Sequence, residues 1–230
     1  MLFRSADPNA VTVPTARLLS KSYAASLCGQ VNPARASTPG PKGNADGNGD
    51  TLVLSAGDSA GNMVSWVNSN FDDFGSGPTI PGYGIVLHNR GSLFSLDPKS
   101  PNAIAPHKRP FNTLSAGFVM RNNEPLMTVT LMGGDMQAQG HAQILVDVFD
   151  LGANLQAAAD MARYRHSQIS NLLRLESSLA RLLGSPLEML GQDVRSINGR
   201  DVGGVQWLMK TDAGYRAGSD FRKDGQAAGW

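Results

Sequence analysis

The chain has 230 residues, of which 41% are hydrophobic, and its formal net charge is +1. This near-neutral balance, with Lys and Arg scattered along the chain, argues against a protein that binds nucleic acid or a membrane surface. Cys28 is the single cysteine, which excludes a disulfide framework within the chain and a cysteine-rich zinc site. No stretch approaches the roughly 20 apolar residues that a membrane span requires.

Residues 1–28 open the chain with a short helical pattern over 14–27, in which apolar residues recur on neighbouring turns. The first eight residues lack the apolar core of a secretory signal. We therefore expect no export signal in this chain. Its opening is more typical of the middle of a protein than of a beginning, which indicates either a fragment or a short open reading frame cut from a longer gene.

Residues 29–50 have the composition of a flexible linker, because Gly, Pro, Asn and Ser dominate and almost nothing is apolar. The pattern changes abruptly after Asp50. From Thr51 the residues alternate as in a β-strand, a turn follows at 58–62, and a second strand is predicted over 63–70. A glycine-rich loop over 74–84 leads to a short predicted strand at 85–88.

The second half of the chain predicts another hairpin and then helices. Strands over 116–121 and 125–132 flank a turn at 122–123, and Gly133-Gly134 ends the second strand. A helix is expected to begin near Asp135, a good N-cap residue, and another covers 155–162. Residues 171–190 carry a helical or mixed pattern, and a strand at 204–211 precedes a turn and a loose tail. These elements predict a layered α/β (α+β) fold of mostly antiparallel sheets with outer helices.

Seven short strings carry a resemblance to a known family. They are Asp50-Thr51, Asp58–Asn62, Phe74–Gly77, Pro81-Gly82 with Gly84-Ile85 and Leu87–Arg90, Lys108–Phe111, Met132–Gln137 and Ala162–His166. In this order and spacing they resemble the small subunit of γ-glutamyltranspeptidases, and the Asn-Arg-Gly and Gly-Gly-Asp-Met-Gln variants are most similar to the acylase-like branch. The resemblance covers roughly residues 50–230, and residues 6–27 more weakly resemble the end of the large subunit.

The resemblance implies half of an N-terminal-nucleophile hydrolase with an αββα sandwich. Such a precursor cuts itself before a Thr, here between Asp50 and Thr51, and the new terminal Thr attacks an amide to form an acyl-enzyme. The chain would then divide into a large-subunit-like end (1–28), a linker ending at the cut (29–50) and a catalytic domain (51–230). No cofactor or metal is expected, and the implied partners are a small-molecule amide substrate and a large subunit.

The resemblance names the candidate catalytic residues, and their chemistry is consistent with it. A Thr hydroxyl needs a base, and the α-amine of a terminal Thr51 would supply one, since its reference pKa is about 7.7–8.0. Ser69 aligns with a hydroxyl residue that hydrogen-bonds the nucleophile, although a cross-strand polar pair would explain it equally well. Gly133 and Gly134 match an oxyanion-hole pair, which needs backbone N–H groups aimed at the developing alkoxide.

The substrate-binding positions, Asn89, Arg90, Asn112 and Thr113, depart from the family pattern. Asn112 and Thr113 stand where the family usually has two serines near the substrate carboxylate. Arg90 and Leu93 stand where transpeptidases place a Gln and an Asp that hold the glutamyl amine, and neither would bind an ammonium group. Phe71 replaces a substrate-contacting Asn.

Three interpretations therefore stay open. The first is an autoprocessing γ-glutamyltransferase or glutathione-hydrolase-like enzyme that acts on a γ-glutamyl or related acyl amide through Thr51. The second is a non-catalytic, light-chain-like fragment that needs a large-subunit partner. The third is a cephalosporin- or glutaryl-type amide acylase. The sequence leaves the substrate and the compartment open, although members of the family are often periplasmic or extracellular.

Overall fold

The computed structural model describes residues 6–37 and 50–230, and for Asp50 the backbone alone. Most of the predicted 29–50 linker therefore lies outside the described residues. The predicted helix over 14–27 is split into α1 (Thr15–Leu18) and α2 (Lys21–Cys28). The break has a local cause, because the Ser20 hydroxyl caps α2 by accepting the Tyr23 N–H at 3.2 Å.

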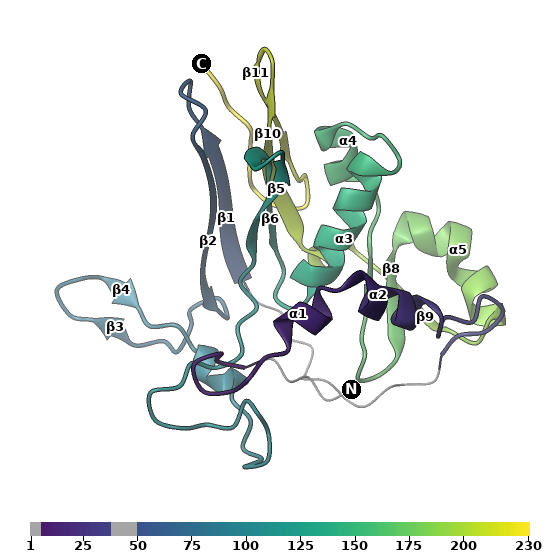
Figure 1. Cartoon of the computed structure of the whole chain (residues 1–230), viewed down its shortest axis with the longest axis horizontal. Helices are drawn as coiled ribbons and strands as arrows, with labels where there is room; N and C mark the ends of the chain where they lie inside the picture. The colour runs from purple at the N-terminus through teal and green to yellow at the C-terminus, as the bar shows by residue number, and fades with distance from the viewer. Residues whose placement is uncertain (1–5, 38–49) are drawn as a thin grey trace.

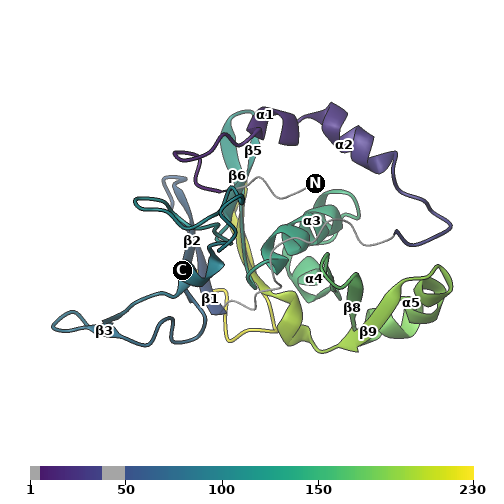
Figure 2. The ribbon, with the colours of Figure 1, turned by 90° about the horizontal axis from the view of Figure 1, so that it is seen from below.

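The first predicted hairpin is confirmed as β1 (Asp50–Gly57) and β2 (Met63–Phe71), which pair antiparallel and form a sheet of their own. The glycine-rich loop carries a small hairpin, β3 (Thr79–Ile80) and β4 (Ile85–Val86), and is followed by the short helix η1 (Arg90–Leu93). Figure 2 shows β3 projecting away from the body of the molecule. The second predicted hairpin is confirmed as β5 (Ala116–Arg121) and β6 (Glu124–Met132).

β6 lies inside a four-stranded sheet of order β11-β10-β6-β5, in which β10 spans Gly204–Thr211 and β11 spans Gly214–Ser219. The two faces of β6 carry different chemistry. Met127, Val129 and Leu131 belong to the apolar core that also contains Ile144, Leu155 and Trp207. The alternate residues Thr128 and Thr130 are fully buried and hydrogen-bond toward the β1–β2 hairpin. Because side chains alternate along a strand, one strand can face a helical layer and a second sheet at once.

The contact between the two sheets is largely made by hydroxyl groups. Thr128 Oγ1 donates to Ser55 Oγ at 2.8 Å, and the Ser65 and Thr130 hydroxyls lie 2.5 Å apart. Each of these four hydroxyls therefore has a partner, as burial in a low-dielectric interior requires. These bonds fix the β1–β2 hairpin, and hence Thr51 at its start, against β6.

Helices cover the other face of the four-stranded sheet. They are α3 (Met136–Phe149), which begins directly after Asp135 as expected, and α4 (Leu155–Asp160). The layers are thus hairpin, sheet and helices (Figure 1). The expected α+β architecture with mostly antiparallel sheets is confirmed.

The last third of the chain differs from the sequence interpretation in two places. Residues 171–190 resolve into β8 (Leu172–Glu176) and α5 (Ser177–Met189), and β8 joins β7 (Tyr164–His166) and, in parallel, β9 (Asp193–Ile197). The expected loose tail is wrong in its first part, because β11 (Gly214–Ser219) pairs with β10 (Gly204–Thr211). The β11 residues show little apolar alternation, so its pairing comes from backbone hydrogen bonds to β10 rather than from a local pattern.

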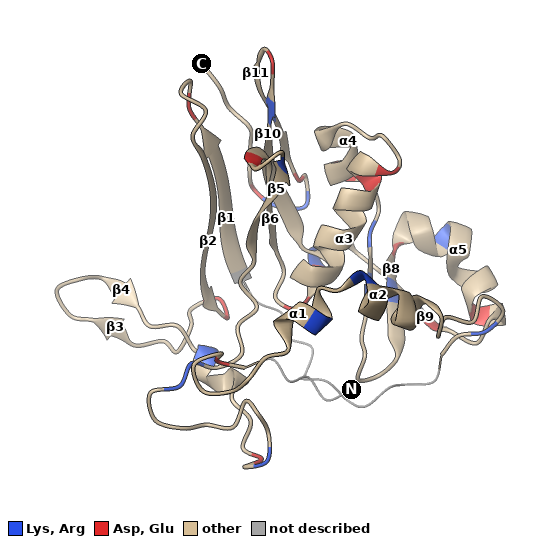
Figure 3. Cartoon of the chain, in the orientation of Figure 1, with Lys and Arg blue, Asp and Glu red and all other residues tan. Residues whose placement is uncertain are grey.

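The charged positions are scattered along the described ribbon (Figure 3). In the part of the chain that the structure describes, no helix combines the length and hydropathy needed to cross a bilayer.

Candidate active site

Thr51 and Ser69 meet at an irregularity in the β1–β2 ladder. Asp50 pairs with Phe71 and Leu52 with Asn68, so Thr51 alone faces both Ser69 and Asn70. Such a bulge changes the direction of the side chains beside it. Here it brings the two hydroxyl groups together, and Thr51 Oγ1 donates to Ser69 Oγ at 3.0 Å.

Ser69 Oγ also accepts the Phe71 N–H at 3.0 Å, so its position is fixed from two sides. Phe71 is buried and has a φ of 79°, a left-handed conformation that a bulky residue seldom adopts. A non-glycine residue in this region carries strain, which the surrounding structure must hold in place. The hydroxyl pair therefore lies on a constrained strand end.

A cavity of about 270 Å³ opens beside this pair and is lined mainly by polar residues. Its lining consists of Thr51, Leu52, Asn68, Ser69, Asn70 and Asp73. Asp73 was not among the residues singled out from the sequence, because a lone acid in a turn carries no motif. Thr51 also lines a second, larger hollow together with Met132, the residue before Gly133.

Gly133 and Gly134 lie between β6 and α3 with φ values of 123° and 58°. At Gly133 a Cβ atom would come within 2.9 Å of Gly203 Cα, so only glycine fits there. Their carbonyl groups accept the first helical N–H groups, those of Met136 and Gln137, at 3.1 Å. Since the start of α3 also carries the positive end of the helix dipole, this turn is suited to stabilise an anion.

Arg90 is a buried cation, with 4% of its surface exposed. Its Nη1 donates to Asn112 Oδ1 and Thr113 Oγ1, both at 3.2 Å, and its guanidinium lies 5.3 Å from the Phe71 ring centroid. Nη2 is enclosed and has no hydrogen-bond partner among the described residues. Burial lowers the pKa of Arg90 from its usual range, and no carboxylate within the described residues neutralises it by an ion pair.

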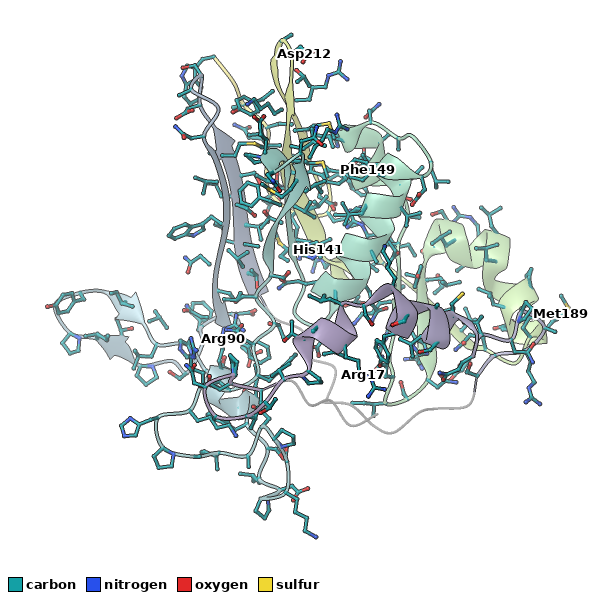
Figure 4. The ribbon with its side chains drawn as sticks, in the orientation of Figure 1. Arg17, Arg90, His141, Phe149, Met189 and Asp212 are labelled. Carbon is teal, nitrogen blue, oxygen red and sulfur yellow. The ribbon has the colours of Figure 1, made fainter. Side chains whose placement is uncertain are left out.

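The structure thus connects most of the positions singled out from the sequence. Thr51 contacts Ser69, and Arg90 joins Asn112 and Thr113, with Phe71 between the two groups (Figure 4 marks Arg90 below the β1–β2 hairpin). Asn89 is different, because its side chain is bonded to Asp72 through both its oxygen and its nitrogen. Within the described residues, no group of three or more His, Cys, Asp or Glu side chains could hold a metal ion.

Known proteins include clear relatives of this chain. The family model of gamma-glutamyltranspeptidase matches residues 3–230. Among curated proteins, the oxamate amidohydrolase proenzyme of Klebsiella pneumoniae is 33% identical over 97% of the chain and 43% of its own length. The glutathione hydrolase-like YwrD proenzyme of Bacillus subtilis is 30% identical with the same two coverages. The chain therefore spans less than half the length of these relatives.

Two solved structures superimpose on this chain. A cephalosporin acylase from Bacillus halodurans superimposes with a TM-score of 0.88 at 34% identity, over 98% of this chain and 41% of the acylase. A gamma-glutamyltranspeptidase from Pseudomonas nitroreducens has the same fold, with a TM-score of 0.71 at 24% identity over 77% of this chain and 98% of its own.

Proposed function

Since the chain belongs to the γ-glutamyltranspeptidase family, we propose that it forms the nucleophile-bearing half of an amidohydrolase or acyltransferase in which Thr51 is the nucleophile. The 3.0 Å contact between the Thr51 and Ser69 hydroxyls carries this proposal. It holds the attacking oxygen at one end of a rigid hairpin, beside a polar cavity.

The chemistry begins with a cut of the peptide bond between Asp50 and Thr51. Before the cut the Thr51 nitrogen is an amide and cannot act as a base. After the cut it is an amine with a reference pKa of about 7.7–8.0, so part of it is neutral near pH 7. In this scheme residues 1–28 and the 29–50 linker belong to the N-terminal product, and residues 51–230 form the catalytic domain.

The neutral amine takes the hydroxyl proton as Thr51 Oγ1 attacks the amide carbon of the substrate. Ser69 orients that hydroxyl, and the Gly133 and Gly134 N–H groups stabilise the negative oxygen of the tetrahedral intermediate. The proton then passes to the leaving nitrogen, the C–N bond breaks, and an ester on Thr51 remains. Water or an amine attacks the ester carbon and restores the hydroxyl.

One observation favours an acylase over a γ-glutamyl enzyme. A γ-glutamyl group carries an ammonium, and the buried cation of Arg90 would repel it. The half-buried Leu93, at the end of the same short helix, offers no charged or polar side-chain atom. An acyl group without the amine, of the glutaryl type, is the substrate class that Arg90, Asn112 and Thr113 suit better.

We further propose a large-subunit-like partner that packs against the β1–β2 hairpin. The hairpin leaves Leu52, Leu54 and Trp66 exposed on its outer face, and the relatives are more than twice as long as this chain. We infer that the remaining length of a family protein covers this face. Without it, the isolated chain would be the light-chain-like fragment of the second interpretation.

The test is the intact mass of the purified chain after incubation, beside Thr51→Ala and Thr51→Ser variants. A cut between Asp50 and Thr51 that Thr51→Ala lacks and Thr51→Ser retains supports the nucleophile. If the chain alone stays uncut, the same three proteins are incubated with a family large subunit. A Thr51→Ala protein that still cuts itself and turns over an anilide would refute the assignment. Comparing γ-glutamyl and glutaryl p-nitroanilides on the complete protein then separates the two substrate classes.

A further inference from the structure

Asp7 connects the beginning of the chain to a loop that lies 102 positions further on. Its side chain is 3% exposed, and Oδ2 accepts the backbone N–H of Arg109 at 2.9 Å. Oδ1 accepts the Asn9 N–H at 3.0 Å and lies 3.4 Å from Arg109 Nη2. Because the Arg109 side chain is 72% exposed, the ion pair is screened by water, and the backbone bond is the stronger tie.

The loop that Asp7 holds runs from the end of η1 to the substrate-binding positions and has little regular structure. Asn102 bridges its two sides, since Nδ2 donates to the Leu93 carbonyl at 2.7 Å and Oδ1 accepts the Phe111 N–H at 2.9 Å. Lys108 Nζ donates to the carbonyls of Pro101 and Ala103. Two backbone hydrogen bonds also join Ser95 to Asn102 and Ile104. The shape of the loop therefore rests on a small number of contacts.

Arg109 lies close in sequence to two of the candidate substrate-binding residues. Three residues later the chain reaches Asn112 and Thr113, whose side chains accept hydrogen bonds from the Arg90 guanidinium. Arg90 contacts Phe71, and Phe71 bonds the same Ser69 hydroxyl that contacts Thr51. A short series of contacts therefore leads from Asp7 to the candidate nucleophile.

The segment that carries Asp7 is held mainly at its ends. Between them, α1 and α2 bury no residue, and Figure 2 shows this segment arching from the sheet toward α5. At the far end Ala36 N donates to the Leu190 carbonyl at 2.7 Å, and Asn171 Nδ2 donates to the Ser37 carbonyl at 3.1 Å. Asp7 is the only buried residue within 6–37.

We propose that Asp7 is a positioning residue, which shapes the loop bearing Asn112 and Thr113 from the N-terminal side of the proposed cut. The substrate site is then built by both products of self-cleavage, and Asp7 is a tie that keeps them together. The inference rests on the proposed function for the existence of the cut and of the substrate site. The contact itself is independent of both.

Limited trypsin digestion of the 230-residue chain tests the contact without any substrate. The bond after Lys108 lies inside the loop, whereas the bond after Arg109 precedes Pro110 and resists trypsin. We expect Asp7→Ala to speed cleavage after Lys108 on the order of tenfold, because the Arg109 N–H loses its charged acceptor and the loop loses a tie. Asp7→Asn should have a smaller effect, since an amide oxygen can still accept the Arg109 N–H.

Two controls distinguish a local change in the loop from a general loss of stability. The bond after Arg121, in the β5–β6 turn, should be cut at an unchanged rate. Asp97→Asn is the matched control, because Asp97 is an exposed acid of the same loop whose carboxylate accepts the nearby Lys99 N–H. An unchanged rate after Lys108 in Asp7→Ala would overturn the proposal. So would faster cutting at all sites in both Asp7 variants, which would mean general loss of stability.

Steady-state kinetics of the complete, processed protein distinguish a residue that positions the substrate-binding side chains from one that only stabilises the fold. With glutaryl p-nitroanilide as the probe, Asp7→Asn should raise KM several-fold and leave kcat within about twofold, since it alters binding and not the nucleophile. Self-cleavage should be unaffected. A fall in kcat at constant KM would contradict the positioning role. Failure of Thr51→Ala to block the cut would instead refute the proposed function and leave the digestion result standing.

Discussion

The Thr51 hydroxyl donates to the Ser69 hydroxyl across 3.0 Å, at a point where one residue of β1 faces two of β2. The two residues are 18 positions apart in the chain. The bulge and the bond from Phe71 together leave Ser69 Oγ little freedom. Thr51 is therefore oriented before any substrate binds.

Ser69→Ala should slow self-cleavage on the order of ten- to a hundredfold, because a misplaced attacking group loses that much rate. The measurement is the time course of intact mass. Ser65→Ala is the control, since Ser65 lies on the same strand and its hydroxyl meets Thr130 instead. Equal rates for the two variants would show that Ser69 is only a cross-strand polar partner.

Gly133→Ala should destabilise the fold by about 1–3 kcal/mol, because alanine would be strained at this positive φ and would contact Gly203. It should also block self-cleavage by displacing the backbone N–H groups. Gly152→Ala provides the comparison, since its φ is 71° and nothing lies within 4 Å of the added atom. Urea unfolding measures both, and a Gly133 variant no weaker than the Gly152 variant would contradict the close packing.

His141 on α3 should make stability fall in mild acid (Figure 4). Burial lowers the pKa of His141 below its ordinary value of 6.5, and Nε2 has no partner among the described residues. The unfolded chain therefore takes up the proton first, and stability is lost as the pH falls through about 6.5. His141→Gln should flatten the change in urea midpoint between pH 7 and pH 5, whereas exposed His107→Gln should leave it as in the parent chain.

Asp220→Asn should cost about 3–5 kcal/mol, the usual effect of removing one partner from a buried ion pair. Asp220 accepts Arg163 Nη2 at 2.6 Å and Arg222 Nη1 at 3.0 Å, and Arg222 also pairs with Glu176. The network holds the start of β10 beside Gly203, because Asp220 also accepts the Val205 N–H. The thermal midpoint of Asp220→Asn is compared with that of Asp193→Asn, an exposed acid; similar midpoints would contradict the expected cost.

The outer face of the hairpin should make the isolated chain self-associate. Leu54 and Trp66 are direct cross-strand partners with exposed fractions of 48% and 58%. Adjacent exposed apolar residues of this size favour association. Sedimentation should show oligomers that Trp66→Lys reduces and that a large-subunit partner suppresses. A parent chain that stays monomeric and unfolds cooperatively would contradict the inference that a large subunit covers this face.

Local signals in the sequence determined much of the scaffold. Both predicted hairpins form, because alternating side chains and turn residues such as Asn122 and Asn123 act over a few positions. The ordered strings from Asp50 to His166 determined the family, and through it the positions of Thr51, Ser69, Gly133 and Gly134. Their catalytic and binding roles, and those of Arg90, Asn112 and Thr113, stay predictions.

Only the tertiary structure decided the relationships between distant residues. β11 was missed because its pairing with β10 rests on backbone hydrogen bonds that leave no apolar pattern. The parallel β8–β9 pair was missed because α5 lies between the two strands. The burial of Arg90 without an ion-pair partner among the described residues, and the tie from Asp7 to Arg109, depend on which groups the folded chain excludes from water. That exclusion is a property of the packed chain, and local sequence patterns do not encode it.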